Sequence, residues 1–173
     1  MDGAWLDLFA DGTLWKLLLA LLLGGLVGLE REWHGRAAGL RTHVLVCLGA
    51  TILLVAARGA SEHFAAETSL GRLVLDPNRI SAGIVTGIGV LGAGAILRTG
   101  DMIRGLTTAG CIWFVAALGI VIGNGLYGLA VVSTLLMLLV LILFDVIEHA
   151  IPPVAYRSLS VAVAAEDHEE VER

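Results

Sequence analysis

The sequence predicts an all-α bundle of about five membrane-spanning helices. Of its 173 residues, 57% are apolar and only 16% are charged, whereas a soluble domain carries about 25% charged residues. Five apolar runs approach the length that a helix needs to cross a bilayer. We expect a transmembrane domain over 1–153 and a short cytoplasmic tail over 154–173. The expected spans are 14–29, 43–57, 80–97, 106–122 and 126–147.

The first and last spans have clear end signals. Trp15 and Trp33 bracket the first span and lie 18 residues apart, about 27 Å along a helix, which suits an aromatic residue at each membrane interface. The first dozen residues contain acids but no Lys or Arg, so we expect this span to be a retained helix and not a cleaved signal. Pro152 and Pro153 end the last span.

A polar segment, 58–79, separates the second and third spans. Its apolar residues predict a short amphipathic helix on the membrane surface, and Asp76-Pro77 predicts the start of the third span. Asn124-Gly125 predicts a tight turn between the last two spans. The apolar residues in question are Phe64, Leu70, Leu73 and Val74.

Positive charges favour one orientation. With five spans, the side that holds the loop after span one, the loop after span three and the C-terminus carries seven Lys and Arg residues: 31, 36, 41, 98, 104, 157 and 173. The other side carries four, at 16, 58, 72 and 79. The positive-inside rule therefore places the C-terminus in the cytoplasm and the N-terminus outside.

Glycines indicate close helix packing, because small residues let helices approach one another in lipid. Span three has glycines on several faces, so we expect it at the centre of the bundle, whereas the large apolar residues of span five, 135–144, should face lipid. Glycine-lined faces also suggest a homodimer. The expected packing glycines are Gly24, Gly28, Gly83, Gly87, Gly92 and Gly94.

A weak internal repeat relates spans one and two to spans three and four. A shift of 66 residues aligns Gly28 with Gly94, Gly39-Leu40 with Gly105-Leu106, and Thr42 with Thr108. Each unit is then a helical hairpin that closes on the cytoplasmic side, with an axis along the membrane normal. Chance identity at glycine-rich positions is the alternative.

Polar residues concentrate in a first loop, where span one leaves the bilayer and span two enters it. A charge at membrane depth is costly unless it is paired. We therefore expect Glu30 or Glu32 to pair with Arg41 and Thr42 to cap span two; the alternative is an ordinary solvated loop. The residues of this loop cluster are Glu30, Arg31, Glu32, Arg41, Thr42 and His43.

A second cytoplasmic loop precedes span four with Arg104, Thr107 and Thr108. Helix N-termini attract anions. Together with Arg41, these residues form a candidate site for a phosphate or a lipid head group, with simple helix capping as the alternative.

Other chemistry has little support. Asp145 and His149 share a helix face, but such pairs are common at solvated helix ends, and Cys47 and Cys111 fit small buried hydrophobes. No nucleophile–base set, phosphate loop, cofactor motif or basic patch is present, so we expect no enzyme, no cofactor, no confident metal site and no nucleic-acid partner. No ionisable residue lies at the middle of any span, where proton-coupled transporters usually place one.

Five motifs resemble the MgtC/SapB family of bacterial membrane proteins. They are GLVGLERE at 25–32, AGLRTH at 38–43, DPNRI at 76–80, GIGVLGAGAI at 87–96 and RGLTTA at 104–109, followed by Trp113. The resemblance implies an inner-membrane protein with a cytoplasmic C-terminus, linked to growth when magnesium is scarce.

The resemblance leaves two functions open. Family members are often labelled magnesium transporters, yet the family's better-supported role is regulatory, through partner membrane proteins that include the proton-driven ATP synthase for some members. Virulence-type members have a larger C-terminal domain, and often Asn and Cys where this chain has Thr107 and Phe114. The packing glycines and the lack of an ionisable residue at the middle of any span favour a regulatory or interaction protein, with magnesium or small-ion transport as the alternative.

Overall fold

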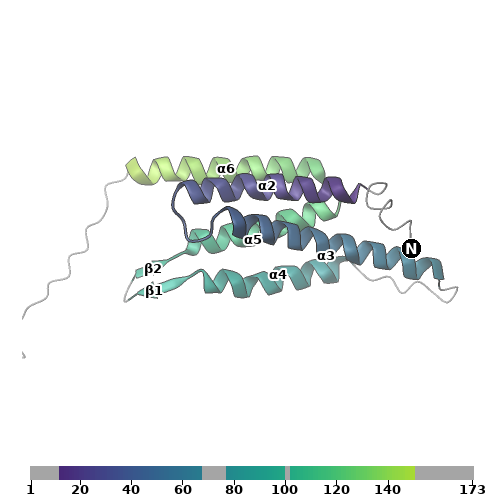
Figure 1. Cartoon of the computed structure of the whole chain (residues 1–173). Coiled ribbons are helices and arrows are strands. Elements are labelled where there is room, and N and C mark those ends of the chain that lie inside the picture. The colour runs from purple at the N-terminus through teal and green to yellow at the C-terminus, as the bar shows by residue number, and fades with distance from the viewer. Residues whose placement is uncertain (1–11, 68–76, 100–101, 151–173) are drawn as a thin grey trace, which may run out of the picture. The chain divides into compact units, whose positions relative to one another are not determined.

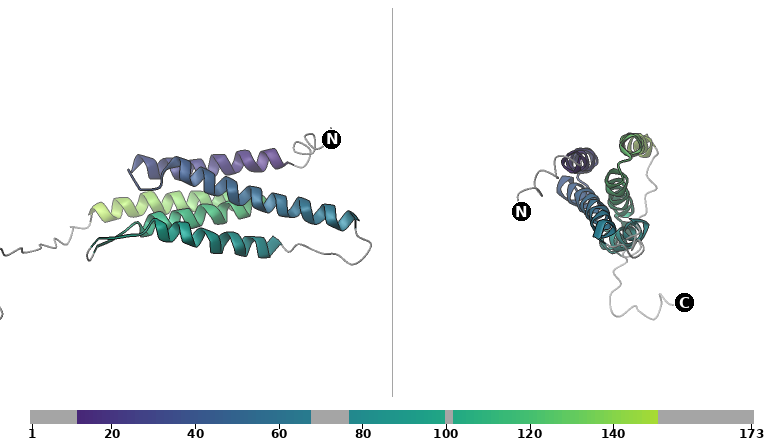
Figure 2. Two further views of the ribbon diagram at one scale, coloured as in Figure 1. Left: turned by 60° about the horizontal axis from the view of Figure 1, so that its bottom comes forward. Right: turned by 90° about the vertical axis from the view of Figure 1, so that its right-hand side faces the viewer.

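The computed structural model describes residues 12–67, 77–99 and 102–150, which form five helices and one β-hairpin. The elements are α2 Thr13–Trp33, α3 Leu40–Glu67, α4 Pro77–Gly94, β1 Leu97–Thr99, β2 Met102–Arg104, α5 Leu106–Gly123 and α6 Tyr127–Ala150 (Figure 1). The chain forms two compact units, 1–141 and 142–173. In the first unit, the helices lie side by side and alternate in direction along the chain (Figure 2).

The five helices coincide with the five apolar runs, so the predicted all-α fold is confirmed. Four are long and apolar enough to cross a membrane: α2, the stretch Leu40–Ala60 of α3, α5, and α6 as far as Ile147. The fifth, α4, has 18 residues and a polar first turn, Pro77-Asn78-Arg79. It lies against α3 and α5 and runs beside them (Figure 1).

Two features differ from the sequence prediction. The region 58–67 continues α3 and does not begin a separate surface helix, because its alanines are strong helix formers; Leu70, Leu73, Val74 and Asp76 lie outside the described residues. The third helix ends at Gly94 and not at Leu97. The chain then forms an antiparallel hairpin, which pairs Leu97 with Arg104 and Thr99 with Met102.

The centre of the bundle is α3, which lies between α2 and α5 and contacts both at backbone distance. A Cβ atom added at Gly24 would lie 2.8 Å from the Cβ of Cys47, and one added at Gly28 would lie 2.7 Å from the Cα of Leu40. On the other side of α3, a Cβ at Gly119 would lie 2.8 Å from the Cβ of Ala50. Only glycine permits these contacts, since real Cβ atoms do not approach other atoms so closely.

One hydrogen bond reinforces the contact between α3 and α5. The hydroxyl of Thr51, which is fully buried, lies 2.9 Å from the carbonyl oxygen of Cys47 and 3.1 Å from that of Gly119. It therefore shares its proton between its own helix and the neighbouring one. Polar side chains commonly link helices in this way inside a membrane.

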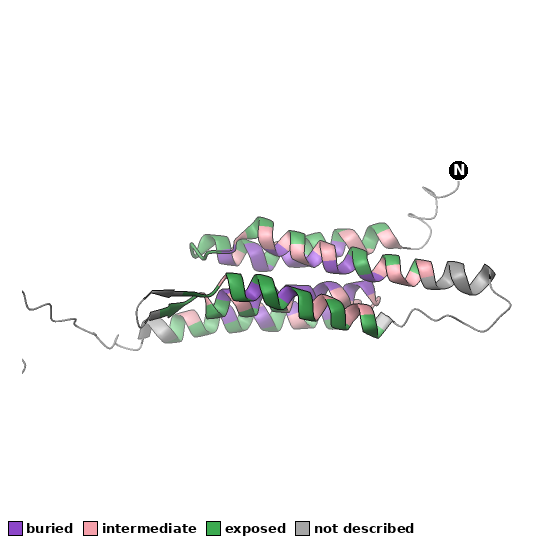
Figure 3. Ribbon diagram, turned by 90° about the horizontal axis from the view of Figure 1, so that it is seen from below, coloured by how far each residue is buried: buried purple, intermediate pink, exposed green. Residues whose placement is uncertain are grey.

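The prediction that span three is the centre of the bundle is wrong. Among the described residues, a Cβ at Gly83, Gly87 or Gly94 would meet nothing within 4 Å, and one at Gly92 would reach only Ala109, at 3.8 Å. Much of α4 is exposed (Figure 3). Branched side chains make the contact instead, because Ile88 is buried against Ile112 and Ala116 of α5.

The first-unit part of α6 packs one face against the core and leaves the other exposed. Ala130, Met137 and Leu141 join the buried cluster that contains Cys111 and Val115 of α5. The opposite face is exposed and apolar, as expected for a surface that contacts lipid; it includes Leu135, Leu136 and Leu139.

We predict that Gly119→Ala destabilises the bundle, whereas Gly110→Ala on the same helix does not. The new methyl at Gly119 would collide with the carbonyl oxygen of Cys47, but at Gly110 it would meet nothing within 4 Å. Overpacking costs about 1–3 kcal/mol, and an unhindered Gly→Ala change in a helix stabilises by about 1 kcal/mol. Thermal unfolding in detergent measures both, and equal melting temperatures would contradict the packing described.

Candidate functional site

Charged side chains are buried at the end of the bundle where α2 ends and α3 begins. We define the polar cluster as Glu30, Arg31, His34 and His43. Arg31 is 3% exposed and His43 is fully buried, while the side chain of Glu30 is 9% exposed. Such burial requires charge partners, because the desolvation of an unpaired charge is costly.

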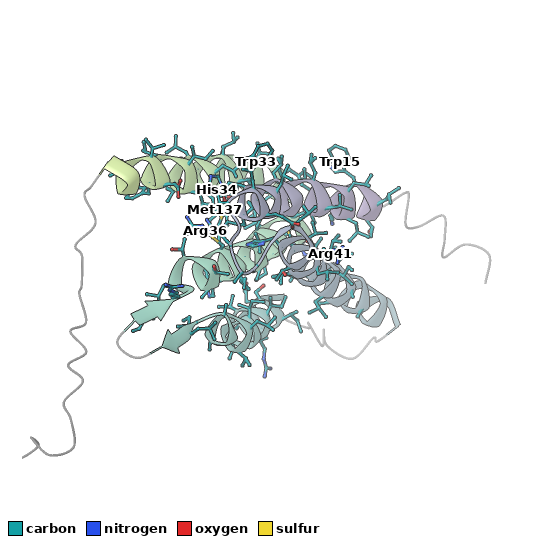
Figure 4. The ribbon with its side chains drawn as sticks, turned by 60° about the vertical axis from the view of Figure 1, so that its left-hand side comes forward. Trp15, Trp33, His34, Arg36, Arg41 and Met137 are labelled. Carbon is teal, nitrogen blue, oxygen red and sulfur yellow. The ribbon has the colours of Figure 1, made fainter. Side chains whose placement is uncertain are left out.

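Glu30 provides the negative charge of the polar cluster. One of its carboxylate oxygens lies 3.5 Å from a guanidinium nitrogen of Arg31, and the other lies 3.0 Å from Nδ1 of His34. Arg31 occupies the last turn of α2, where the helix dipole also favours a cation. Figure 4 shows His34 and Arg36 at this end of α2, and Trp15 towards its other end.

His43 brings α3 into the polar cluster. Its Nδ1 lies 2.8 Å from the carbonyl oxygen of Gly39. A carbonyl oxygen only accepts hydrogen bonds, so Nδ1 carries a proton and donates it. In the neutral ring, Nε2 is then an acceptor that points away from the backbone of α3.

Three buried atoms of the polar cluster have no hydrogen-bond partner among the described residues. They are Oε2 of Glu30, Nε of Arg31 and Nε2 of His43. Nε of Arg31 is a donor and the other two are acceptors when His43 is neutral. Each of the three is therefore a group that a buried water molecule can satisfy.

The loop between α2 and α3 is closed by Glu32 and not by an ion pair with Arg41. Oε2 of Glu32 accepts a hydrogen bond of 2.8 Å from the backbone N–H of Leu40, the first residue of α3. A Cβ at Gly39 would lie 2.5 Å from the same oxygen, so a side chain there would displace the Glu32 carboxylate from this position.

The expected Arg41 ion pair and Thr42 cap are therefore wrong. Arg41 is exposed, and among the described residues the carboxylate of Glu30 pairs with Arg31 and His34 instead. Arg31 lies nearer to Glu30 than Arg41 does, because it is the next residue in the last turn of α2. Thr42 is already the third residue of α3, too late to cap it.

The second loop is closed by a glycine contact. Gly105 has a φ of 90°, and a Cβ there would collide with the carbonyl oxygen of Ala95 at the end of α4. The cap of α5 at Gly105 uses no side-chain hydrogen bond. Arg104 and Thr107 are exposed, whereas Thr108 is buried. Among the described residues, no hydrogen bond or ion pair links Arg104 with Arg41. The phosphate site expected between the two loops therefore stays a prediction.

The remaining candidate residues, Cys111, Asp145 and His149, do not form a recognisable metal site among the described residues. Cys111 of α5 is buried within electrostatic reach of Arg31 and Glu30. In the described part of the chain, no three His, Cys, Asp or Glu side chains are grouped as metal ligands. Asp145 belongs to the second unit, and the side chain of His149 lies outside the described residues.

The pairing of His34 with Glu30 was not predicted from the sequence, although His34 itself is exposed. The available signal was its spacing, because Glu30 and His34 are four residues apart and face the same side of a helix. The burial of Arg31 had no comparable signal, since it depends on how α3 and α5 pack against α2.

Comparisons with known proteins agree on one family. The MgtC family matches residues 17–150. An Escherichia coli K12 protein named "Putative magnesium transporter YhiD" is 45% identical over 129 residues, which is 75% of this chain and 59% of that protein. The protein MgtC of Salmonella typhimurium LT2 is 42% identical over 123 residues, 71% of this chain and 48% of that protein.

The match covers only part of these relatives. The chain spans about half of their length, and the same holds for an uncharacterized Haemophilus influenzae protein, 37% identical over 78% of this chain and 56% of its own. No solved structure matches the chain.

We predict that Arg31→Gln destabilises the protein far more than Arg41→Gln, although both remove one positive charge. Arg31 is buried beside Glu30, and the loss of one member of a buried pair costs about 3 kcal/mol. Arg41 is exposed, so its loss should change stability by less than about 0.5 kcal/mol. Thermal unfolding in detergent compares them; similar losses would show that the polar cluster does not stabilise this end of the bundle.

Proposed function

Because the chain belongs to the MgtC family, we propose that it acts in the bacterial inner membrane in adaptation to low magnesium, as a regulatory protein that works through contacts with a partner membrane protein. It is a membrane protein by its family and its four long apolar helices. The proposal makes it a non-enzymatic protein without a cofactor.

The observation that carries the regulatory proposal is the backbone-level packing of α3. Gly24 and Gly28 of α2 hold one side of α3, and Gly119 and Gly123 of α5 hold the other. Alternating access requires one group of helices to rock against another. Helices locked at this distance resist such movement, which favours a rigid body that presents surfaces to a partner.

The proposed orientation places both loops in the cytoplasm. If α4 crosses the membrane with the other four helices, the α2–α3 and α4–α5 connections share one side of the bilayer (Figure 1). That side holds Arg31, Arg36, Arg41 and Arg104. The positive-inside rule then supports a cytoplasmic C-terminus and an outer N-terminus.

Magnesium or small-ion transport is the alternative function. The name of the Escherichia coli relative YhiD favours it. A transport path would have to use backbone or hydroxyl oxygens, since the charged side chains of the described spans gather at their ends.

We predict that the purified full chain, reconstituted in liposomes that contain a magnesium indicator, gives no more magnesium influx than protein-free liposomes. In parallel, its expression should restore growth in low magnesium to a bacterial strain that lacks its own family member. A known magnesium channel in the same liposomes is the positive control for influx.

The two readouts separate the alternatives. Saturable magnesium influx through the wild-type chain would replace the regulatory proposal with transport. Failure to restore growth would contradict a role in low magnesium, provided that the chain is detected in the membrane fraction.

A further inference from the structure

We propose that the groove between α3 and α4 binds an anionic phospholipid, with one acyl chain along the groove and the phosphate at Arg79. The inference is independent of the regulatory proposal. It rests on the shape, the length and the single charge of the groove.

The groove is open on one side and has a volume of about 660 Å³. Leu45 and Leu53 of α3 line one wall, Gly83, Gly87 and Leu91 of α4 line the other, and Ala116 of α5 contributes to the lining. The lining is therefore almost wholly apolar, which suits a hydrocarbon chain.

Glycines make the groove hollow. A Cβ atom at Gly83 or Gly87 would meet nothing within 4 Å, so these positions leave space where larger side chains would fill the gap between the two helices. The glycines of α4 thus create a cavity, in contrast to those of α2 and α5, which bring backbones into contact.

The length of the groove matches one leaflet. Arg79 and Leu91, at the two ends of its α4 wall, are twelve residues apart, about 18 Å along a helix. A leaflet contributes about half of the ~30 Å hydrocarbon core. A partner helix that crosses the bilayer would need contact along the full thickness, so the groove fits an acyl chain better.

Among the described residues, Arg79 is the only charged one that lines the groove. It occupies the first turn of α4 and is exposed, and no carboxylate among the described residues pairs with it. The N-terminal end of a helix adds a partial positive charge. An anionic phosphate therefore finds two favourable interactions at this end, while the acyl chain extends towards Leu91.

Native mass spectrometry of the full chain tests the proposal with equal amounts of dioleoyl-phosphatidylglycerol and dioleoyl-phosphatidylcholine, which share their acyl chains. The wild type should retain more phosphatidylglycerol. Arg79→Gln should reduce that preference roughly fivefold, the effect of one basic residue near a lipid phosphate. Lys16→Gln removes the same charge from α2, away from the groove, and should leave the preference unchanged.

A second pair of variants tests the acyl chain. Gly87→Leu fills the groove and should abolish retention of both lipids, whereas Gly89→Leu on the same helix lies outside the groove lining and should retain them. Neither position is crowded, because a Cβ at each would meet nothing within 4 Å. Unchanged melting temperatures confirm that both variants fold.

Two outcomes would overturn the proposal. If Gly87→Leu and Gly89→Leu retain equal amounts of lipid, the groove holds no acyl chain. If Gly87→Leu leaves lipid retention unchanged but converts a dimer into a monomer, a second copy of the chain occupies the groove instead.

Discussion

The structure depends on the close contact of α3 with α2 on one side and with α5 on the other, where glycines of α2 and α5 leave no room for a side chain of their own. Gly24, Gly28, Gly119 and Gly123 supply this contact. Lipid tails are as apolar as leucine, so helices in a membrane associate through close packing and hydrogen bonds and not through the hydrophobic effect. The close approach also brings the hydroxyl of Thr51 within reach of the carbonyl of Gly119.

The same close approach explains how charged groups are buried at one end of the bundle. His43 is itself part of the contact between α2 and α3, because a Cβ at Gly28 would lie 3.0 Å from the Cβ of His43. The ring is therefore held against α2, where Glu30 and Arg31 end the helix. The glycine contacts between α2 and α3 thus help to hold His43 against the charged end of α2.

Much of the fold could be predicted from the sequence, because five apolar runs of sufficient length leave few alternatives to five helices. The role of individual glycines could not. The motif Gly24-x-x-x-Gly28 indicated close packing and the contacts agree, but the richer set in α4 borders open space. A glycine in the sequence can mark either a close helix contact or an open groove. Because it has no side chain, its position in the sequence does not show which of the two it is.

The candidate site shows the same limit. Sequence spacing located the polar residues at the correct helix ends, yet it paired Glu30 with Arg41 where the structure uses Arg31 and His34. The sequence alone allows several pairings of opposite charges across a loop. Which of them are buried depends on helix rotation, and the rotation follows from contacts along the whole span. The β-hairpin was missed because its strands have only three residues each.

The hydrogen bond from Leu40 to Glu32 joins residues only eight positions apart, and this has a consequence for biosynthesis. The end of α2 supplies the acceptor that begins α3, so the first helical hairpin contains its own start signal and closes without help from later residues. Contacts of such short sequence separation form early and fast. The α2–α3 pair can therefore enter the membrane as a finished unit during synthesis, and it offers α5 an assembled surface on which to dock.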